Sequence, residues 1–158
     1  MASAPQKPLK QVAALPVSVD AEGRLRVLLV TSRETQRFII PKGWPMKGRK
    51  DHEAAAIEAE QEAGVVGRIR KKPIGTYTYW KRRADHFDFC RVKVFVLEVR
   101  DRLPDWREKG QRRGAWLLVG EAADLVDEYG LVEILRDLPQ RLAGTLARGK
   151  SLKASSPR

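Results

Sequence analysis

Glu58 and Glu62, two glutamates one helical turn apart, are the residues of this sequence best placed to do chemistry. Residues three and four positions apart lie on one face of an α-helix, so Gln61 joins them in a single polar cluster. Two carboxylates at this spacing form a good seat for Mg²⁺, which prefers oxygen ligands and completes its shell with waters and substrate phosphates. Such an ion can neutralise a pyrophosphate, orient it and activate the attacking water. On an arbitrary helix, the same spacing more often marks an outward face with solvated glutamates.

A loop punctuated by glycine and proline, residues 42–50, directly precedes this cluster. Its backbone N–H groups and the positive end of the following helix dipole favour a bound anion. The loop also carries the cations Lys42, Lys47, Arg49 and Lys50. We expect Asp51 to cap a helix that runs from about His52 to Ala63, and Gly64 to end it. The pattern therefore predicts an anion-binding loop joined to a carboxylate-bearing helix.

Residues 43–65 resemble the Nudix box, in which a glycine, five residues, a glutamate and seven residues lead into R-E-U-x-E-E-x-G-U, with U apolar. The chain matches this pattern at Gly43, Glu58, Glu62, Gly64 and Val65. The resemblance implies a hydrolase of phosphoanhydride bonds that uses Mg²⁺, or alternatively Mn²⁺, with Glu58 and Glu62 as metal ligands. It extends beyond the box, from about residue 10 to residue 138.

Three residues depart from the box. Arg49 and Ile57 replace its first glutamate and its arginine, and Gln61 replaces the first glutamate of its Glu-Glu pair. A glutamine offers a neutral amide oxygen as a metal contact, but it cannot neutralise a second cation as a carboxylate would. We therefore expect weaker or differently coordinated metal and reduced turnover, or a compensating carboxylate from elsewhere in the chain.

Glu108, Glu98 and Asp51 are the candidates for that carboxylate. Glu108 lies in a polar loop, residues 106–113, which resembles the loop from which some Nudix enzymes present a distal glutamate as base or ligand. We therefore place it with Glu58 and Glu62 among the catalytic residues. Glu98 lies inside an expected strand and could equally face solvent, and Asp51 is better explained as the helix cap.

Residues 29–33, 41–45 and 103–108 look most like diphosphoinositol polyphosphate phosphohydrolases and their bacterial relatives. This resemblance implies a small, multiply phosphorylated substrate, and arginine suits bidentate contact with phosphate. The expected substrate contacts are Lys10, Ser32, Arg33, Lys42, Gly43, His86 and Arg112 or Arg113. Dinucleoside polyphosphates and inorganic polyphosphate stay open, because Tyr79 and Trp80 could stack on a base, although aromatic residues in strands are more often core.

The formal charge of +11 raises the question of a polyanionic partner. About half of this excess lies in residues 1–10 and 148–158. Residues 1–9 and 148–158 are rich in Ser, Ala, Pro and Lys and are expected to be disordered tails. Nucleic acid is a weaker alternative partner that would bind through these tails, because no aromatic-bearing RNA-binding strands are evident. A degenerate Nudix domain that binds a phosphorylated ligand or RNA with little or no hydrolysis is the other alternative.

Apolar periodicity predicts one α/β domain over residues 10–147. Strands are expected at residues 11–19, 24–32, 74–80, 87–99 and 113–119, with a short apolar run at 37–41. A C-terminal amphipathic segment from Ala122 to Leu138 is expected to be helical, with a break at Tyr129 and Gly130. Together with the helix at 52–63, this order describes a Nudix-type α/β/α sandwich with a mixed β-sheet.

Composition bounds the remaining properties. The chain lacks an apolar run of ~18 residues and an apolar segment near its start, so we expect no membrane association and a cytoplasmic protein, monomeric or homodimeric. Cys90 is the single cysteine, and its apolar, aromatic neighbours indicate a buried strand position and not a nucleophile.

Overall fold

The computed structural model describes residues 7–146 of the chain. The expected tail at 148–158 lies outside these residues, as do the first six residues of the expected N-terminal tail. The first strand already begins at Leu9. Within the described part, no helix has the length and apolar character needed to cross a membrane.

The fold begins with a β-hairpin made from the first two apolar runs. Its strands, β1 (Leu9–Val19) and β2 (Leu25–Thr31), pair in antiparallel register. Asp20 closes the turn, because its carboxylate accepts the backbone N–H groups of Glu22 and Arg24 at 3.0 and 2.9 Å. The hairpin predicted from the alternation and the turn residues is confirmed.

Eight strands form one mixed sheet built around β1 and β7 (Phe87–Arg102). These two strands run parallel, in a register that places Leu9 opposite Cys90. The order along the sheet is β3-β2-β1-β7-β5, while β4, β6 and β8 pair with β1, β7 and β2, respectively. The remaining strands are β3 (Phe38–Ile39), β4 (Lys42–Gly43), β5 (Val65–Ile69), β6 (Gly75–Arg82) and β8 (Gly114–Leu118).

Helix α1 (Asp51–Ala63) packs on one face of this sheet through a row of alanines. Ala54, Ala55 and Ala59 are fully buried against a core that includes Phe95. Their small side chains let the helix lie close to the strands, which brings its glutamates near the loop before it. The helix ends at a glycine with a φ of 70°, as the sequence predicted.

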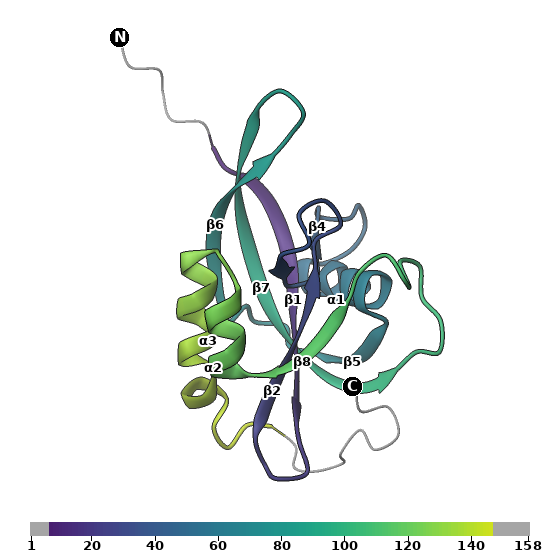
Figure 1. The fold of residues 1–158 in the computed structure, drawn as a ribbon, viewed down its shortest axis with the longest axis vertical. Helices are drawn as coiled ribbons and strands as arrows, with labels where there is room; N and C mark the ends of the chain where they lie inside the picture. The colour runs from purple at the N-terminus through teal and green to yellow at the C-terminus, as the bar shows by residue number, and fades with distance from the viewer. Residues whose placement is uncertain (1–6, 147–158) are drawn as a thin grey trace.

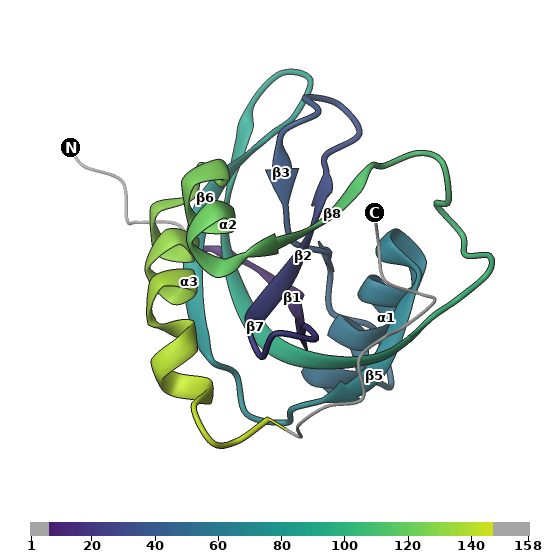
Figure 2. The same cartoon turned by 60° about the horizontal axis from the view of Figure 1, so that its bottom comes forward.

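Helices α2 (Val119–Leu125) and α3 (Tyr129–Leu142) cover the opposite face. The apolar stripe of α3 is buried in a second core, where its members are Leu131, Ile134, Leu135, Leu138 and Leu142. Figures 1 and 2 show α1 on one side of the sheet and the α2–α3 pair on the other. The predicted α/β/α sandwich with a mixed sheet is therefore confirmed.

Two short strands escaped prediction. The two-residue β4 is too short to show periodicity, and β5 contains Gly67, which a sequence pattern treats as a strand breaker. The structure requires a glycine at this position, because a Cβ on Gly67 would collide with the backbone carbonyl oxygen of Glu98. Gly67 is therefore explained by the close approach of the β5 and β7 backbones and not by a turn.

The expected N-cap was wrong by one residue. Asp51 is the first residue of α1, and its carboxylate pairs with Lys10 and Lys93 at 2.6 and 3.1 Å. The capping position belongs to Lys50, whose backbone N–H donates to the carboxylate of Glu53 at 2.8 Å. Asp51 is therefore held by two lysines from neighbouring strands and not by the end of its own helix.

The break in the C-terminal helical segment also falls earlier than expected. It lies at residues 126–128, and Tyr129 and Gly130 open α3. Gly130 packs so closely on Tyr77 of β6 that a Cβ would collide with that side chain. Gly130 therefore allows α3 to pack closely on the sheet. In a local sequence pattern, such a glycine looks the same as one that breaks a helix.

Candidate active site

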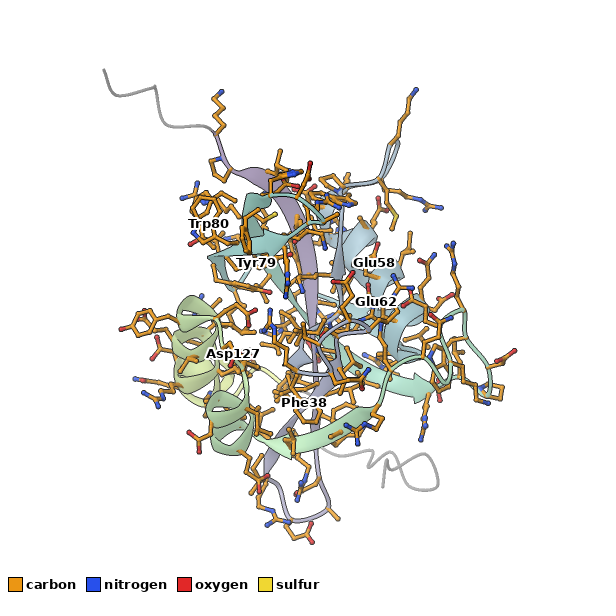
Figure 3. The ribbon with its side chains drawn as sticks, turned by 45° about the horizontal axis from the view of Figure 1, so that its top comes forward. Phe38, Glu58, Glu62, Tyr79, Trp80 and Asp127 are labelled. Carbon is orange, nitrogen blue, oxygen red and sulfur yellow. The ribbon has the colours of Figure 1, made fainter. Side chains whose placement is uncertain are left out.

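Glu58 and Glu62 lie one turn apart on α1 and face the loop that precedes the helix (Figure 3). The backbone N–H of Lys42 donates a hydrogen bond to Glu62 Oε1 at 3.3 Å. Gly43 packs so closely on Glu58 that a Cβ at this position would collide with the carboxylate. The glycine of the box is thus the residue that allows the loop to lie directly against the carboxylate pair.

Burial raises the pKa of both glutamates. Glu62 is only 6% exposed, and its desolvation raises the pKa to about 8, with the neighbouring Glu58 acting in the same direction and Arg112 opposing it. Desolvation likewise raises the pKa of Glu58, which also feels the negative charge of Glu108. Three carboxylates therefore crowd into a poorly hydrated place, an arrangement that an additional cation relieves.

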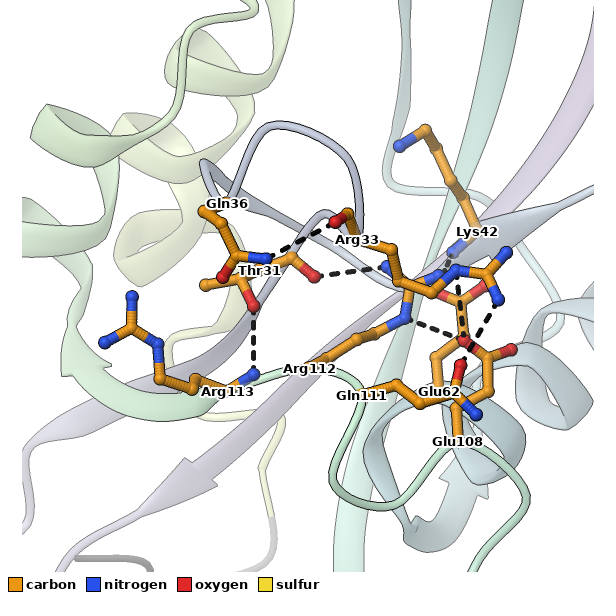
Figure 4. Close-up of polar contacts among 9 residues, drawn as sticks. All are labelled: Thr31, Arg33, Gln36, Lys42, Glu62, Glu108, Gln111, Arg112 and Arg113. Atoms are coloured by element: carbon orange, nitrogen blue, oxygen red, sulfur yellow. Dashed lines mark hydrogen bonds and ion pairs between the residues drawn. The ribbon is translucent and has the colours of Figure 1, made fainter.

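Arg112 lies among these carboxylates. Its Nε donates to Glu108 Oε1 at 2.9 Å, its Nη2 lies 3.9 Å from Glu62 Oε1, and its Nη1 donates to the backbone carbonyl of Thr31 at 3.2 Å (Figure 4). The side chain is only 9% exposed. The guanidinium joins the α1 carboxylates to Glu108 and supplies one fixed positive charge at the centre of the site.

Of the three candidates for the compensating carboxylate, the structure brings only Glu108 to the site. Its backbone N–H donates to the main-chain carbonyl of Gln61 at 3.0 Å, which holds the loop on the C-terminal turn of α1. Glu98 is buried elsewhere and pairs with Arg70 at 3.0 Å. Asp51 lies at the other end of α1, paired with lysines. Neither the compensating role nor the alternative of a solvent-facing Glu98 holds, because this carboxylate is buried and paired with Arg70.

A cavity of about 340 Å³ opens beside Glu62. It brings together the predicted residues Ser32, Arg33, Lys42, Glu62 and Arg112. Residues that the sequence did not single out for this role complete the wall: Gln11, Glu34, Thr35, Arg37, Ile39, Lys81 and Arg82. Tyr79 and Trp80, considered as stacking residues, line the cavity as well. Glu62, one member of the carboxylate pair, therefore lies in the wall of a largely cationic and aromatic cavity.

Lys42 is a cation of the cavity wall with a lowered pKa. Its burial lowers the pKa to about 8, while the nearby Glu128 and Glu62 act in the opposite direction. The ammonium lies 5.1 Å from the centre of the Tyr79 ring. A lysine that is poorly solvated and faces a cavity gains from an anionic ligand, because the ligand replaces the missing hydration.

Arg37 forms a second cationic element of the cavity wall. Its Nη2 pairs with Glu128 Oε2 at 2.6 Å, just before α3, and its Nη1 lies 3.7 Å from Asp127. Glu128 Oε1 and Arg37 Nη1 are buried and have no hydrogen-bond partner among the described residues. In the sequence, the only signal for Arg37 as a cavity residue was its position at the start of the short apolar run 37–41.

Three predicted substrate contacts, Lys10, Gly43 and His86, are not among the residues that line the cavity. Lys10 pairs with Asp51 at the start of α1. His86 lies on an exposed turn, where its Nδ1 is 2.6 Å from Asp85 Oδ1 and its Nε2 is 3.1 Å from Asp88 Oδ1. The main-chain carbonyl of Gln61 accepts the hydrogen bond from the backbone N–H of Glu108. Gly43 lies against Glu58. Cys90 is fully buried in β7, in agreement with a packing residue.

The donor set fits a hard divalent cation. Glu58, Glu62 and Glu108 offer carboxylate oxygens, the ligand type that Mg²⁺ and Mn²⁺ take in proteins. Within residues 7–146, no three acidic, histidine or cysteine side chains already stand in a cation-binding arrangement. Arg112 instead pairs with Glu62 and Glu108, so a bound cation would share these carboxylates with the guanidinium.

Comparison with known proteins identifies relatives named as Nudix hydrolases and as a diphosphoinositol polyphosphate phosphohydrolase. The chain is 35% identical over 114 residues to Nudix hydrolase 13, mitochondrial, of Arabidopsis thaliana, which covers 68% of this chain and 56% of that protein. It is 32% identical over 136 residues to human diphosphoinositol polyphosphate phosphohydrolase 3-beta, which covers 83% of this chain and 78% of that protein. The chain thus spans little more than half the length of its plant relative. No protein-family model matches the chain.

Solved structures share the fold. A Nudix hydrolase from Nitrosomonas europaea superposes with a TM-score of 0.65 at 19% identity, covering 90% of this chain and 98% of that one. The Ap4A hydrolase of C. elegans, in a binary complex, superposes with a TM-score of 0.63 at 19% identity, covering 86% and 98%. At this identity the likeness concerns the fold alone. The chain carries the box on α1, folds into the sandwich that presents it and is 32% identical to the human relative. It therefore belongs to the Nudix hydrolase superfamily.

Proposed function

We propose that this protein is a Mg²⁺-dependent Nudix pyrophosphohydrolase that cleaves a phosphoanhydride bond in a small, polyanionic substrate. One observation carries the proposal: Glu62, one of the two α1 carboxylates, lines a cavity whose wall also holds Arg33, Arg37, Lys42 and Arg112. Carboxylates suit a metal, and the surrounding cations suit several phosphates, so the two halves of the site match the two parts of a metal–polyphosphate ligand.

The cations of the wall bind and orient the phosphate chain. Arg33 reaches into the cavity from the loop after β2, where its Nη1 donates to Gln111 at 3.3 Å. Lys42 comes from β4, and its backbone N–H donates to Glu62. Phosphate groups held between these side chains lie beside the carboxylates, which is the positioning that hydrolysis requires.

The carboxylates supply the acid–base and metal-binding groups. When bound, Mg²⁺ would be held by Glu58, Glu62 and Glu108, and it would neutralise the phosphates and activate water for attack on phosphorus. Glu108 lies close to the α1 pair, where its carboxylate accepts a hydrogen bond from Arg112, and it can also accept a proton from water. Mn²⁺ suits the same oxygen donors.

A second candidate function rests on Arg112 and Gln61. The guanidinium already neutralises Glu62 and Glu108 in part, and Gln61 removes one negative charge from the box. A site with this balance could bind a phosphorylated ligand and release it unchanged. Binding without turnover is therefore the alternative against which hydrolysis is tested.

Purified protein should release phosphate or a phosphorylated product from at least one member of a panel of nucleoside, dinucleoside and inositol pyrophosphates, with Mg²⁺ or Mn²⁺ present. The panel covers the substrates named in two relatives, the human diphosphoinositol polyphosphate phosphohydrolase and the C. elegans Ap4A hydrolase. We favour a substrate of the diphosphoinositol polyphosphate or dinucleoside polyphosphate class, because the cavity combines many cations with the aromatic rings of Tyr79 and Trp80.

Glu62→Gln should lower turnover by at least about a hundredfold, which corresponds to the loss of a group that acts directly in the transition state. Glu60→Gln is the matched control, since Glu60 lies on the same helix but is exposed and faces away from the site. Ligand-induced stabilisation of the wild type without any metal-dependent product, across the whole panel, would support the non-hydrolytic alternative.

A further inference from the structure

The hairpin of β6 and β7 extends beyond the rest of the sheet. The first residue of β1, Leu9, pairs with Cys90, so the part of β7 before Cys90 pairs with β6 alone. Figure 1 shows this hairpin projecting away from the helices at the top of the view. Its turn is closed by the backbone N–H of Arg83, which donates to the carbonyl of His86 at 2.8 Å. The projecting hairpin therefore presents both of its faces outside the two cores.

One face of this hairpin carries aromatic rings and guanidinium groups in alternation. Trp80 is opposite Phe89, Arg82 is opposite Phe87 and Thr78 is opposite Arg91. Because side chains alternate between faces with a period of two, these cross-strand pairs share one side of the hairpin. We call Trp80, Arg82, Phe87, Phe89 and Arg91 the aromatic–basic face.

The rings of this face are unusually exposed for their size. Trp80 is 65% exposed and Phe87 is 60% exposed, although large aromatic side chains are ordinarily buried to a considerable extent. Phe89 supports Trp80 from the neighbouring strand, with ring centroids 4.7 Å apart. Two broad apolar surfaces thus stand in solvent on a backbone that the hydrogen bonds of the hairpin keep in place.

The cations of the face are available to a ligand. Arg82 and Arg91 are exposed, and no ion pair among residues 7–146 involves either of them. A further cation lies beside the face, where the Arg83 guanidinium is 5.7 Å from the centre of the half-exposed Trp44 ring. Rings alone would suit an apolar partner, but rings interleaved with free guanidinium groups match a chain in which flat bases alternate with phosphates.

We propose that the aromatic–basic face binds single-stranded nucleic acid without sequence preference. Bases stack on Trp80 and Phe87, and the phosphates between them contact Arg82 and Arg91. The positive charge of the chain as a whole favours the encounter. The face is a surface of the described domain and does not require the basic tails. Trp80 and Arg82 also line the cavity beside Glu62, so the face adjoins the candidate active site. Phe87, Phe89 and Arg91 lie outside that lining, and binding at these residues does not depend on hydrolysis.

The test is fluorescence anisotropy of labelled oligouridylate and oligothymidylate of about a dozen nucleotides, titrated with the full chain in EDTA so that no hydrolysis occurs. Titrations from about 50 to 200 mM salt give the dependence of affinity on ionic strength. We expect wild-type protein to bind both oligonucleotides. Comparable affinities would assign recognition to bases and phosphates, and a preference for oligouridylate would add a contact to the 2′-hydroxyl.

Two variants separate stacking from charge. Phe87→Ala removes an exposed ring that does not line the cavity, and should weaken binding about fivefold or more, the effect of losing one base–aromatic stack. Replacing Arg82 and Arg91 together by Ala should flatten the slope of log K against log salt by about 1.4, because each lost phosphate contact removes about 0.7.

Matched controls carry the same chemical changes elsewhere. Tyr129→Ala removes a ring that is 77% exposed at the start of α3, and replacing Lys71 and Lys72 by Ala removes two exposed charges from the loop before β6. Circular dichroism spectra and urea unfolding midpoints of all variants establish whether each variant is folded. The proposal is overturned if wild type fails to bind at low salt, or if the control variants weaken binding as much as the hairpin variants. Dimerisation that Phe87→Ala abolishes, without oligonucleotide binding, would instead assign the face to a second copy of the chain.

Discussion

The indole of Trp106 lies directly against Gly64, the glycine that ends α1. A Cβ on Gly64 would collide with three atoms of the Trp106 ring system. The backbone agrees with this contact, since the N–H of Leu103 donates to the carbonyl of Gly64 at 2.7 Å. The last glycine of the box therefore does two things: it ends the helix in a left-handed conformation and it receives the loop that carries Glu108 and Arg112.

Gly64→Ala should destabilise the protein by about 2–4 kcal/mol, because the alanine pays both for a positive φ and for a clash with the Trp106 ring. Gly48→Ala is the matched control. Gly48 has a similar φ of 77° but no neighbouring atom within 4 Å, so its replacement should cost only about 1 kcal/mol. Urea unfolding measures both free energies, and equal losses would argue against the packing of Trp106 as the cause.

Arg112→Ala should destabilise the metal-free protein by about 2 kcal/mol, because Glu62 and Glu108 lose the partner that compensates their burial. Addition of Mg²⁺ should recover part of this loss, since a divalent ion supplies the missing positive charge. Thermal unfolding with and without Mg²⁺ measures the effect. Arg113→Ala, an exposed neighbour on the same loop, should respond to Mg²⁺ as the wild type does. A Mg²⁺ response of Arg112→Ala no larger than that of the wild type would contradict the interpretation.

Gln61→Glu restores the carboxylate that the box usually has and should tighten Mg²⁺ binding about tenfold, or about 1.4 kcal/mol. Isothermal titration calorimetry with Mg²⁺ reads this change directly, whether or not a substrate is turned over. The control is Gln140→Glu, which adds the same charge at an exposed position on α3. If both variants bind Mg²⁺ equally, general charge and not a new ligand accounts for the gain.

Asp20 provides a prediction on pH. Desolvation opposes ionisation of this carboxyl group, but hydrogen bonds from the backbone of Arg24 and the side chain of Arg26 outweigh it and lower the pKa from 3.8 to about 2. Because the folded-state pKa is the lower one, ionised Asp20 contributes stability that is fully present above pH 3.8 and is lost as the pH falls towards 2.

Asp20→Asn should therefore be less stable than the wild type near neutral pH, and the difference between the two should shrink between about pH 4 and pH 2. Urea unfolding at several pH values measures the difference. Glu22→Gln serves as the control, because Glu22 is exposed and its carboxylate lies 3.8 Å from the Arg24 guanidinium, farther than the Asp20 carboxylate does. A gap between Asp20→Asn and wild type that stays constant down to pH 2 would show that charge on Asp20 is not the stabilising element.

The order of strands and helices followed from the sequence because it depends on local periodicity. Alternating apolar residues predicted the β1–β2 hairpin and both long strands of the β6–β7 pair, and the spacing of Glu58 and Glu62 predicted their shared helix face. Short elements with little periodicity, β4 and β5, were missed. Glycines at Gly67 and Gly130 carry ambiguous local signals, since a close packing contact and a chain break use the same residue.

The sequence by itself determined the helix with its two carboxylates and the glycines at either end of the box, all within one contiguous segment. Only the tertiary structure decided which distant groups join them. Glu108 is joined to Glu62 through Arg112 because its loop docks on Gly64, whereas Glu98 pairs with Arg70. Lys10 forms an ion pair with Asp51 and does not line the cavity. The physical reason is that hydrogen bonds and ion pairs between separate elements depend on register and loop docking, and neither leaves a periodic trace in the sequence.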